Sequence, residues 1–235
     1  MSHLQFQNGA RSPTLRCRII LSILFRKFDI AVRMKQVLFR FDYQTFRESM
    51  SKTGVNLPTP PPQSGAAYLL PSGVISVGTG LGIEIDVSRG VIAARGANPK
   101  ETLDLFNKAV ECIGRDLDLN PQENAWFYEM ISNCSVRIDK DPIEMMFGKF
   151  STCYDSDRLE QILGRKSQIN RIRIGPKSAD PRRPDYYDID IMPDLFRPRD
   201  SLLIEFIYRE PKLEPVQKVA GNLESIISNI VSTIT

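Results

Sequence analysis

The chain has 235 residues and an ordinary composition, 42% hydrophobic and 25% charged. This length suffices for one large domain or two small fused units, each with its own core. The single histidine, His3, lies close to the N-terminus of the sequence. Catalytic triads, His-dependent acid–base chemistry and His-ligated metals are therefore excluded from the main body.

The charge is unevenly distributed along the chain. The formal net charge is +3, but residues 1–33 contain six basic residues and only one acidic residue, Asp29. Residues 34–235 consequently hold a small excess of acidic groups, which gives no general attraction for nucleic acid.

The four cysteines, Cys17, Cys112, Cys134 and Cys153, contain no CxxC pair. This spacing indicates neither a disulfide framework nor a structural zinc site, and it fits a reducing intracellular compartment. We expect Cys134 and Cys153 to be small buried residues.

Residues 1–33 form a basic leader with an apolar run over 19–25 that is too short to span a membrane. Three interpretations are open for it. Translation begins at Met34, which we favour; the segment adds a strand or helix to the domain; or it is an organellar targeting signal.

Alternating strand-like and helix-like patterns follow. In the first half we predict a strand over 37–41, a helix over 43–52, and strands over 67–70, 74–77, 82–87 and 90–95. A long helix should begin at the cap Asn98, with Pro99 in its first turn. Its apolar stripe is predicted to be Leu103, Phe106, Val110, Ile113 and Leu117.

The same order then recurs. We predict a strand over 126–138, helical pieces within 142–164, strands over 169–174, 186–191 and 202–208, and a final helix. A loop over 175–184 holds three basic residues among three prolines. Strand, helix, several strands and a long helix thus occur twice, as expected of an internal duplication.

Two short stretches of sequence carry a resemblance of their own, in addition to the order of the elements. Residues 90–97 read Gly-Val-Ile-Ala-Ala-Arg-Gly-Ala, directly before the long helix, and residues 127–137 read Phe-Tyr-Glu-Met-Ile-Ser-Asn-Cys-Ser-Val-Arg. With the element order, they resemble the TATA-box-binding protein (TBP) family, in the glycine–alanine passage before its helix and in the opening strand of its second repeat. The resemblance implies an α+β fold in which repeats 34–120 and 121–235 form one curved antiparallel sheet, with long helices packed on one face.

The sequence also departs from this family. Arg209 and the three residues after it stand where the second glycine–alanine pair is expected, and Glu129 stands where the family has a groove-reading asparagine. Of the phenylalanines that wedge between base pairs, only Phe206 has a candidate counterpart. The outward positions of the predicted strands carry charges of both signs, whereas a minor-groove binder needs an apolar surface.

The resemblance implies a protein without catalytic, metal or cofactor residues that associates with double-stranded DNA or with the transcription machinery, and with no membrane or small-molecule partner. The residues expected to contact DNA are Arg171, Arg173, Arg182, Arg183, Ile131 and Phe206. The alternative is a protein-interaction or scaffold module of the same fold that does not bind DNA.

A third hypothesis is a magnesium-dependent nuclease. Asp188 and Asp190, with Asp185 and Asp194 nearby, resemble a carboxylate site. We interpret Asp188 and Asp190 instead as strand residues, some of them paired across strands with Arg171 and Arg173. The glycine-rich segment 78–82 precedes a strand and lacks the P-loop lysine, so it is not assigned to nucleotide binding.

Overall fold

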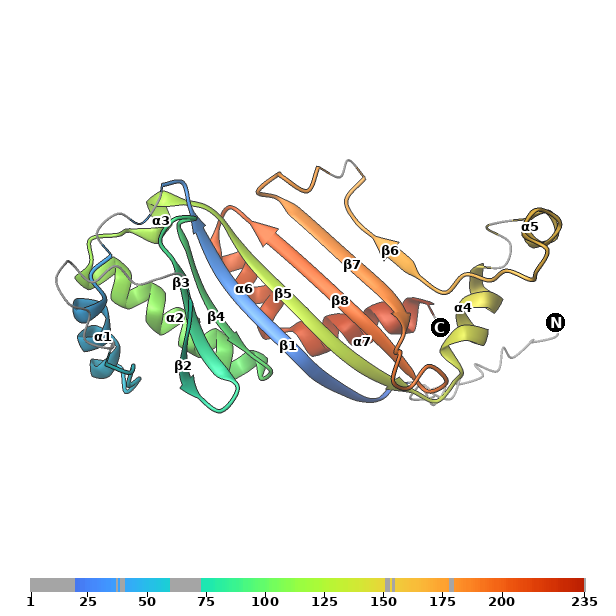
Figure 1. The fold of residues 1–235 in the computed structure, drawn as a ribbon, viewed down its shortest axis with the longest axis horizontal. Helices are drawn as coiled ribbons and strands as arrows, with labels where there is room; N and C mark the ends of the chain where they lie inside the picture. Colours follow the sequence, from blue (N-terminus) through green and yellow to red (C-terminus); the bar gives the residue numbers. More distant parts are fainter. Residues whose placement is uncertain are drawn as a thin grey trace, which may run out of the picture.

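The computed structural model describes residues 20–36, 38, 41–59, 73–150, 153, 155–177 and 180–234. Within these ranges, eight strands form one antiparallel sheet with helices packed against it (Figure 1). The predicted α+β class and antiparallel sheet are confirmed. The strands are β1 (Ile20–Met34), β2 (Gly73–Gly78), β3 (Leu81–Asp86), β4 (Val91–Gly96), β5 (Ala125–Ile138), β6 (Ile172–Ile174), β7 (Tyr186–Pro193) and β8 (Ser201–Glu210). The helices are α1 (Tyr43–Lys52), α2 (Pro99–Asp116), α3 (Pro121–Asn124), α4 (Pro142–Phe150), α5 (Ser156–Leu163), α6 (Leu213–Gly221) and α7 (Leu223–Ile234).

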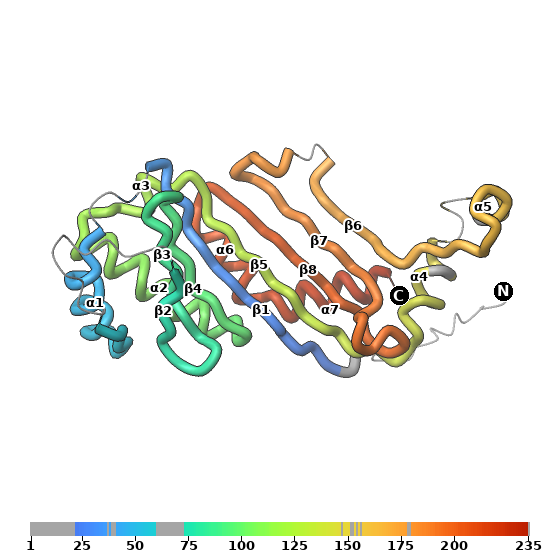
Figure 2. The backbone as a smooth tube through the Cα atoms, viewed as in Figure 1, coloured from blue at the N-terminus to red at the C-terminus, as the bar shows by residue number. Residues whose placement is uncertain are grey.

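The two longest strands, β1 and β5, lie side by side at the centre of the sheet (Figure 2). The full order is β2-β3-β4-β1-β5-β8-β7-β6. Outward from the centre, the first half runs β1, β4, β3, β2 and the second half runs β5, β8, β7, β6. The two halves therefore have the same strand order.

Strand β1 lies in the segment that we interpreted as a leader. In its second half, Phe28, Ile30 and Val32 enter the core and alternate with Asp29 and Ala31, which lie on the other side of the sheet; Asp29 is buried there as well. For residues 20–33 the structure shows the second interpretation, an added strand, and the boundary proposed at Met34 falls at the end of this strand. The run over 19–25 is almost entirely apolar and does not alternate with polar residues, so it lacks the pattern of a half-buried strand.

The predicted strand over 37–41 is not found. Only Leu38 and Phe41 of that segment are described, and neither belongs to a strand. Leu38 donates a backbone hydrogen bond to Val87 and its side chain is buried in the core. The predicted strand over 67–70 lies outside the described residues.

The helices cover one face of the sheet. Helix α2 contacts β1, β3 and β4, while α6 contacts β5 and β8, and α7 contacts β1. In Figure 1 these three helices lie behind the strands. The face toward the viewer carries no helix among the described residues, and we call it the open face. No helix in the described ranges has the length and hydrophobicity needed to cross a membrane.

Helix α2 begins as predicted. The Asn98 side chain accepts hydrogen bonds from the backbone of Lys100 and Glu101, and Pro99 occupies the first turn. The buried side is rotated from the predicted stripe: it contains Phe106 and Ile113, but the other buried positions are Thr102, Leu105, Ala109 and Cys112. The predicted Leu103, Val110 and Leu117 are only partly buried against the core.

Gly96 has a packing role at the junction between β4 and α2. A side-chain Cβ at this position would lie 2.4 Å from Thr102 Oγ1, which is closer than real contacts allow. Thr102 is fully buried and donates a hydrogen bond to the Asn98 carbonyl. The glycine thus lets the first turn of α2 lie directly against the sheet. The predicted final helix is broken at Asn222 into α6 and α7.

Candidate interaction surface on the open sheet face

The open face is built from alternate residues of each strand. In β5, Met130, Cys134 and Val136 are buried beneath the helices, so Glu129 and Ile131 point to the opposite side. The same alternation in β3 buries Ile83 and Ile85.

Two rows of directly opposed residues cross this face. One row contains Glu84, Ala93, Ala31, Glu129 and Arg209. The next row contains Arg95, Asp29, Ile131, Ile207 and Asp188. The alanines and isoleucines lie on the four central strands, where Asp29 and Glu129 alternate with them at the β1–β5 junction.

On the flank of the second half, arginines before or in β6 pair with aspartates of β7. Arg171 Nε lies 2.8 Å from Asp190 Oδ1, and Arg173 Nε lies 2.8 Å from Asp188 Oδ1. These are the predicted cross-strand ion pairs. They run diagonally, because the residue directly opposite Arg173 is Asp190. The hydrogen bond and charge of Asp188 raise the pKa of Arg173.

The flank of the first half contains a similar set. Arg95 pairs with Glu84, Arg89 pairs with Asp86, and Lys27 Nζ lies 3.0 Å from Asp29 Oδ2. Asp86 is buried because the β3–β4 loop folds over it: its Oδ1 accepts hydrogen bonds from Ser88 Oγ at 2.7 Å and from the Arg89 amide at 3.0 Å. These bonds, with the charge of Arg89, hold the pKa of Asp86 well below its usual range.

Arg209, in β8, joins the open face to the loop before β7. Its Nε lies 2.9 Å from Glu129 Oε2, and its guanidinium carbon lies 4.2 Å from the centre of the Phe127 ring. It also donates a 2.7 Å hydrogen bond to the Pro181 carbonyl. The guanidinium group is planar, so it can form these hydrogen bonds at its edge while its face stacks on the ring. A lysine ammonium group could not do both. Arg33 instead stacks on Trp126, 5.4 Å from its ring centre.

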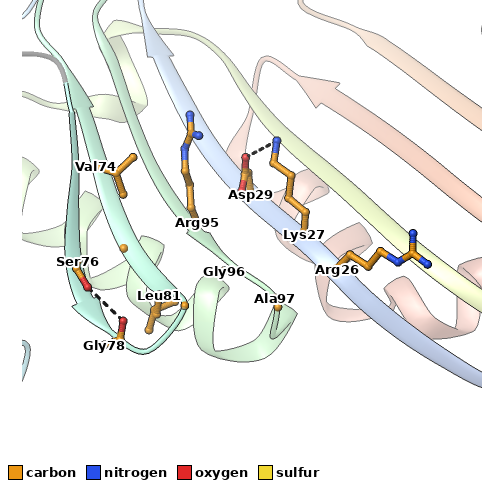
Figure 3. A pocket seen from close by; sticks show the side chains of 12 residues that line it. Arg26, Lys27, Asp29, Val74, Ser76, Gly78, Leu81, Arg95, Gly96 and Ala97 are labelled. Carbon is orange, nitrogen blue, oxygen red and sulfur yellow. Dashed lines mark hydrogen bonds and ion pairs between the residues drawn. The ribbon is translucent and has the colours of Figure 1, made fainter. Parts of the chain in front are cut away.

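A hollow of about 430 Å³ lies on the first half of this face (Figure 3). Gly82 and Gly96 add no side chains to its lining, while Lys27, Asp29 and Arg95 come from β1 and β4. Asp29 and Arg95 face each other across these strands, yet Asp29 Oδ1 and Arg95 Nε have no hydrogen-bond partner among the described residues. Both atoms are buried, and the same two side chains pair with Lys27 and Glu84 through Asp29 Oδ2 and Arg95 Nη2.

The residues expected to contact DNA occupy three different places. Arg171, Arg173 and Ile131 belong to the open face. Arg182 and Arg183 lie in the loop before β7, where Arg182 pairs with Asp180 and Arg183 with Asp185. Phe206 is 5% exposed and packs in the core. It cannot be a wedge on the open face, because in β8 the even-numbered Ile204 and Phe206 point toward the helices.

The carboxylates of the nuclease hypothesis are not gathered at one point. Asp188 and Asp190 bond to arginines, Asp185 bonds to Arg183, and Asp194 lies beneath the β7–β8 loop. Among the described residues, no group of three or more Asp, Glu, His or Cys side chains is arranged to hold a metal ion.

The three described cysteines are free thiols. Cys134 is buried as predicted, and burial raises the pKa of its thiol to about 12. Cys153 is exposed, so its predicted burial is wrong.

Sequence reasoning missed one cluster. Asp194 is fully buried and accepts a hydrogen bond from Ser135 Oγ at 2.6 Å and an ion pair from Arg26. Its partners come from β5 and from the presumed leader, so no local pattern marks them. The adjacent Leu195 and Phe196 do give a signal, since two large apolar residues in a proline-flanked loop are conspicuous.

No protein-family model matches this sequence. No curated protein matches it significantly either.

Proposed function

We propose that this chain is a non-enzymatic binding module of two tandem repeats, similar in plan to the TBP family, which binds a protein on its open face. The shared strand order of the two halves supports the repeat interpretation. So does the recurrence of a buried aspartate at the same point, Asp86 at the end of β3 and Asp194 after β7. Each accepts bonds from a serine hydroxyl, a backbone amide of its own loop and an arginine.

One observation favours a protein over DNA as the partner. Five arginines on the open face each pair with a carboxylate of the same face. To bind a phosphate, such an arginine has to leave its carboxylate, which then faces the DNA backbone unpaired. The basic groups are Arg89, Arg95, Arg171, Arg173 and Arg209.

The centre of the face favours a protein as well. Ala31, Ala93, Ile131 and Ile207 form a small apolar patch near the middle of the face. The charged residues beside it on the same strands, Asp29 and Glu129, pair with Lys27 and Arg209. Protein interfaces likewise combine an apolar core with polar groups around it. The likeness to the TBP family would place the partner among transcription proteins.

A DNA-binding measurement tests the negative half of this proposal. Fluorescence anisotropy with A·T-rich and G·C-rich duplexes at low and moderate salt should show no saturable binding by the full chain. Saturable binding that weakens with salt, and that is lost in the double variant Arg171→Ala/Arg173→Ala, would instead support the DNA function and overturn the proposal.

A selection of random peptides displayed on phage, with the full chain immobilised, tests the positive half. We expect clones whose affinity is lost in Ile131→Lys, which puts a charge in the apolar patch of the face. Ser225→Lys, on the exposed side of α7, is the matched control and should bind normally. Failure to recover any clone, or equal loss in both variants, contradicts a protein-binding open face.

A further inference from the structure

The β7–β8 loop, residues 194–200, has a fixed backbone. The Asp194 amide donates to the Ser201 carbonyl at 2.8 Å, and the Arg197 amide donates to the Asp194 carbonyl at 2.9 Å. The Asp194 side chain accepts from the Phe196 amide at 3.1 Å, and Ser135 and Arg26 hold the same carboxylate from below. The buried Asp194 carboxylate thus ties the loop to β5 and β1.

This fixed loop presents two large apolar side chains to solvent. Leu195 is 86% exposed and Phe196 is 83% exposed, more than any other large hydrophobic side chain in the described ranges. The Arg26 guanidinium lies over the Phe196 ring, 5.2 Å from its centre. Leu24, 64% exposed, lies directly opposite Ser135 and extends the apolar surface onto the sheet. The corresponding β3–β4 loop, residues 87–90, has no such pair.

The charge around this tip has a small basic excess. Arg197 and Arg199 are exposed in the same loop, and Arg26 lies beneath Phe196. Arg26 pairs with the buried Asp194 and Arg197 pairs with Asp200, so the three arginines and two aspartates leave one net positive charge, that of Arg199. A complementary surface therefore combines an apolar cavity with at least one carboxylate.

We propose that Leu195 and Phe196 are an anchor that inserts into an apolar pocket of a partner protein, rimmed by Asp or Glu side chains. Aromatic and arginine side chains dominate the energetics of protein interfaces. Because the loop is already ordered, docking costs little conformational entropy. One ring and one isobutyl group are less apolar surface than membrane anchors use, and the paired carboxylates of the adjoining face disfavour DNA.

This inference rests on the proposed protein-binding function, and its test uses the same phage selection. Recovered peptides are synthesised and titrated calorimetrically against the full chain. We expect them to be rich in acidic and large apolar residues. Affinity should fall at least about tenfold in Leu195→Ser/Phe196→Ser, the loss typical of interface hot spots. The matched control is Ile162→Ser/Leu163→Ser, which removes another adjacent exposed apolar pair, on α5, and should change affinity less than about twofold.

The outcomes separate the two proposals. Loss in the tip variant and in Ile131→Lys supports both. Loss in the tip variant alone supports the anchor and removes the open-face centre from the interface. Loss in Ile131→Lys alone keeps the proposed function and overturns the anchor, and loss in neither overturns both. Duplex DNA and vesicles of phosphatidylcholine with or without phosphatidylserine are titrated in parallel. If the tip variant loses binding only to one of these, the protein anchor is wrong.

Discussion

The Ser135 hydroxyl donates a 2.6 Å hydrogen bond to Asp194 Oδ2, joining the middle of the sheet to a loop 59 residues later in the chain. Both residues are buried, and Arg26 of β1 pairs with the same carboxylate oxygen. Three segments that are distant in sequence therefore meet at one carboxylate.

Replacing this carboxylate should destabilise the protein. In Asp194→Ala, the Ser135 hydroxyl and the Arg26 guanidinium lose their acceptor, so we expect the free energy of unfolding to fall by about 1–3 kcal/mol. Urea denaturation measures the change. Asp180→Ala, which breaks an exposed pair with Arg182, is the control and should cost less than about 1 kcal/mol. Equal losses in the two variants would show that the buried hydrogen bonds of Asp194 stabilise the fold no more than an exposed ion pair does.

Acidification should weaken the contact between α1 and α2. Hydrogen bonds from Arg115 and then from Ser49 lower the pKa of Asp116 from 3.8 to about 2. Because the pKa is lower in the folded state, the stabilisation is present above about pH 3.8 and is lost as the pH falls toward 2. The difference in urea midpoint between wild type and Asp116→Asn should shrink over this range. Titration of the Asp116 carboxyl by NMR should also give a higher pKa in Arg115→Ala; an unchanged pKa contradicts the assigned cause.

A chain that begins at Met34 should fail to fold. It lacks β1, which pairs with both β4 and β5 and contributes Phe28, Ile30 and Val32 to the core. We expect no cooperative thermal transition by circular dichroism, whereas a chain that begins at residue 18 and keeps β1 should unfold cooperatively. A cooperative transition for the shorter chain would mean that the sheet forms without its central strand.

Two glycine-to-alanine substitutions should have opposite effects. Gly96→Ala puts a methyl group 2.4 Å from Thr102 Oγ1, so we expect a loss of about 1–3 kcal/mol from the free energy of unfolding. Gly114→Ala, inside α2, meets only an ordinary 3.6 Å contact with Pro121. It should add about 0.5–1 kcal/mol, because alanine favours the helix. Chemical denaturation of both variants checks the signs, and a stabilised Gly96→Ala would refute the close approach.

Features set by neighbouring residues could be predicted from the sequence. The start of α2 follows from Asn98 and Pro99, which act within one turn. The pairing of Arg171 and Arg173 with Asp190 and Asp188 follows from alternation in two adjacent strands.

Features set by distant residues could not be predicted. The role of Asp194 depends on Arg26, 168 residues earlier. An added strand in residues 1–33 is only one of three interpretations that the sequence leaves open, because the two neighbours of β1 in the sheet lie far along the chain. The predicted contact of Phe206 with DNA depends on which side chains of β8 are buried. That is set by the register of β8 against its neighbours, which the sequence alone does not show.

The central position of β1 also shapes how the protein is made. During translation β1 leaves the ribosome before either of its partner strands: β4 is complete about 60 residues later and β5 about 100 residues later. At the usual ~5–20 residues per second, the edge of β1 that pairs with β5 stays open for on the order of 5–20 s, and the edge that pairs with β4 for a shorter time. We therefore expect nascent chains of this protein to depend on a chaperone that shields this extended segment until both partner strands have arrived.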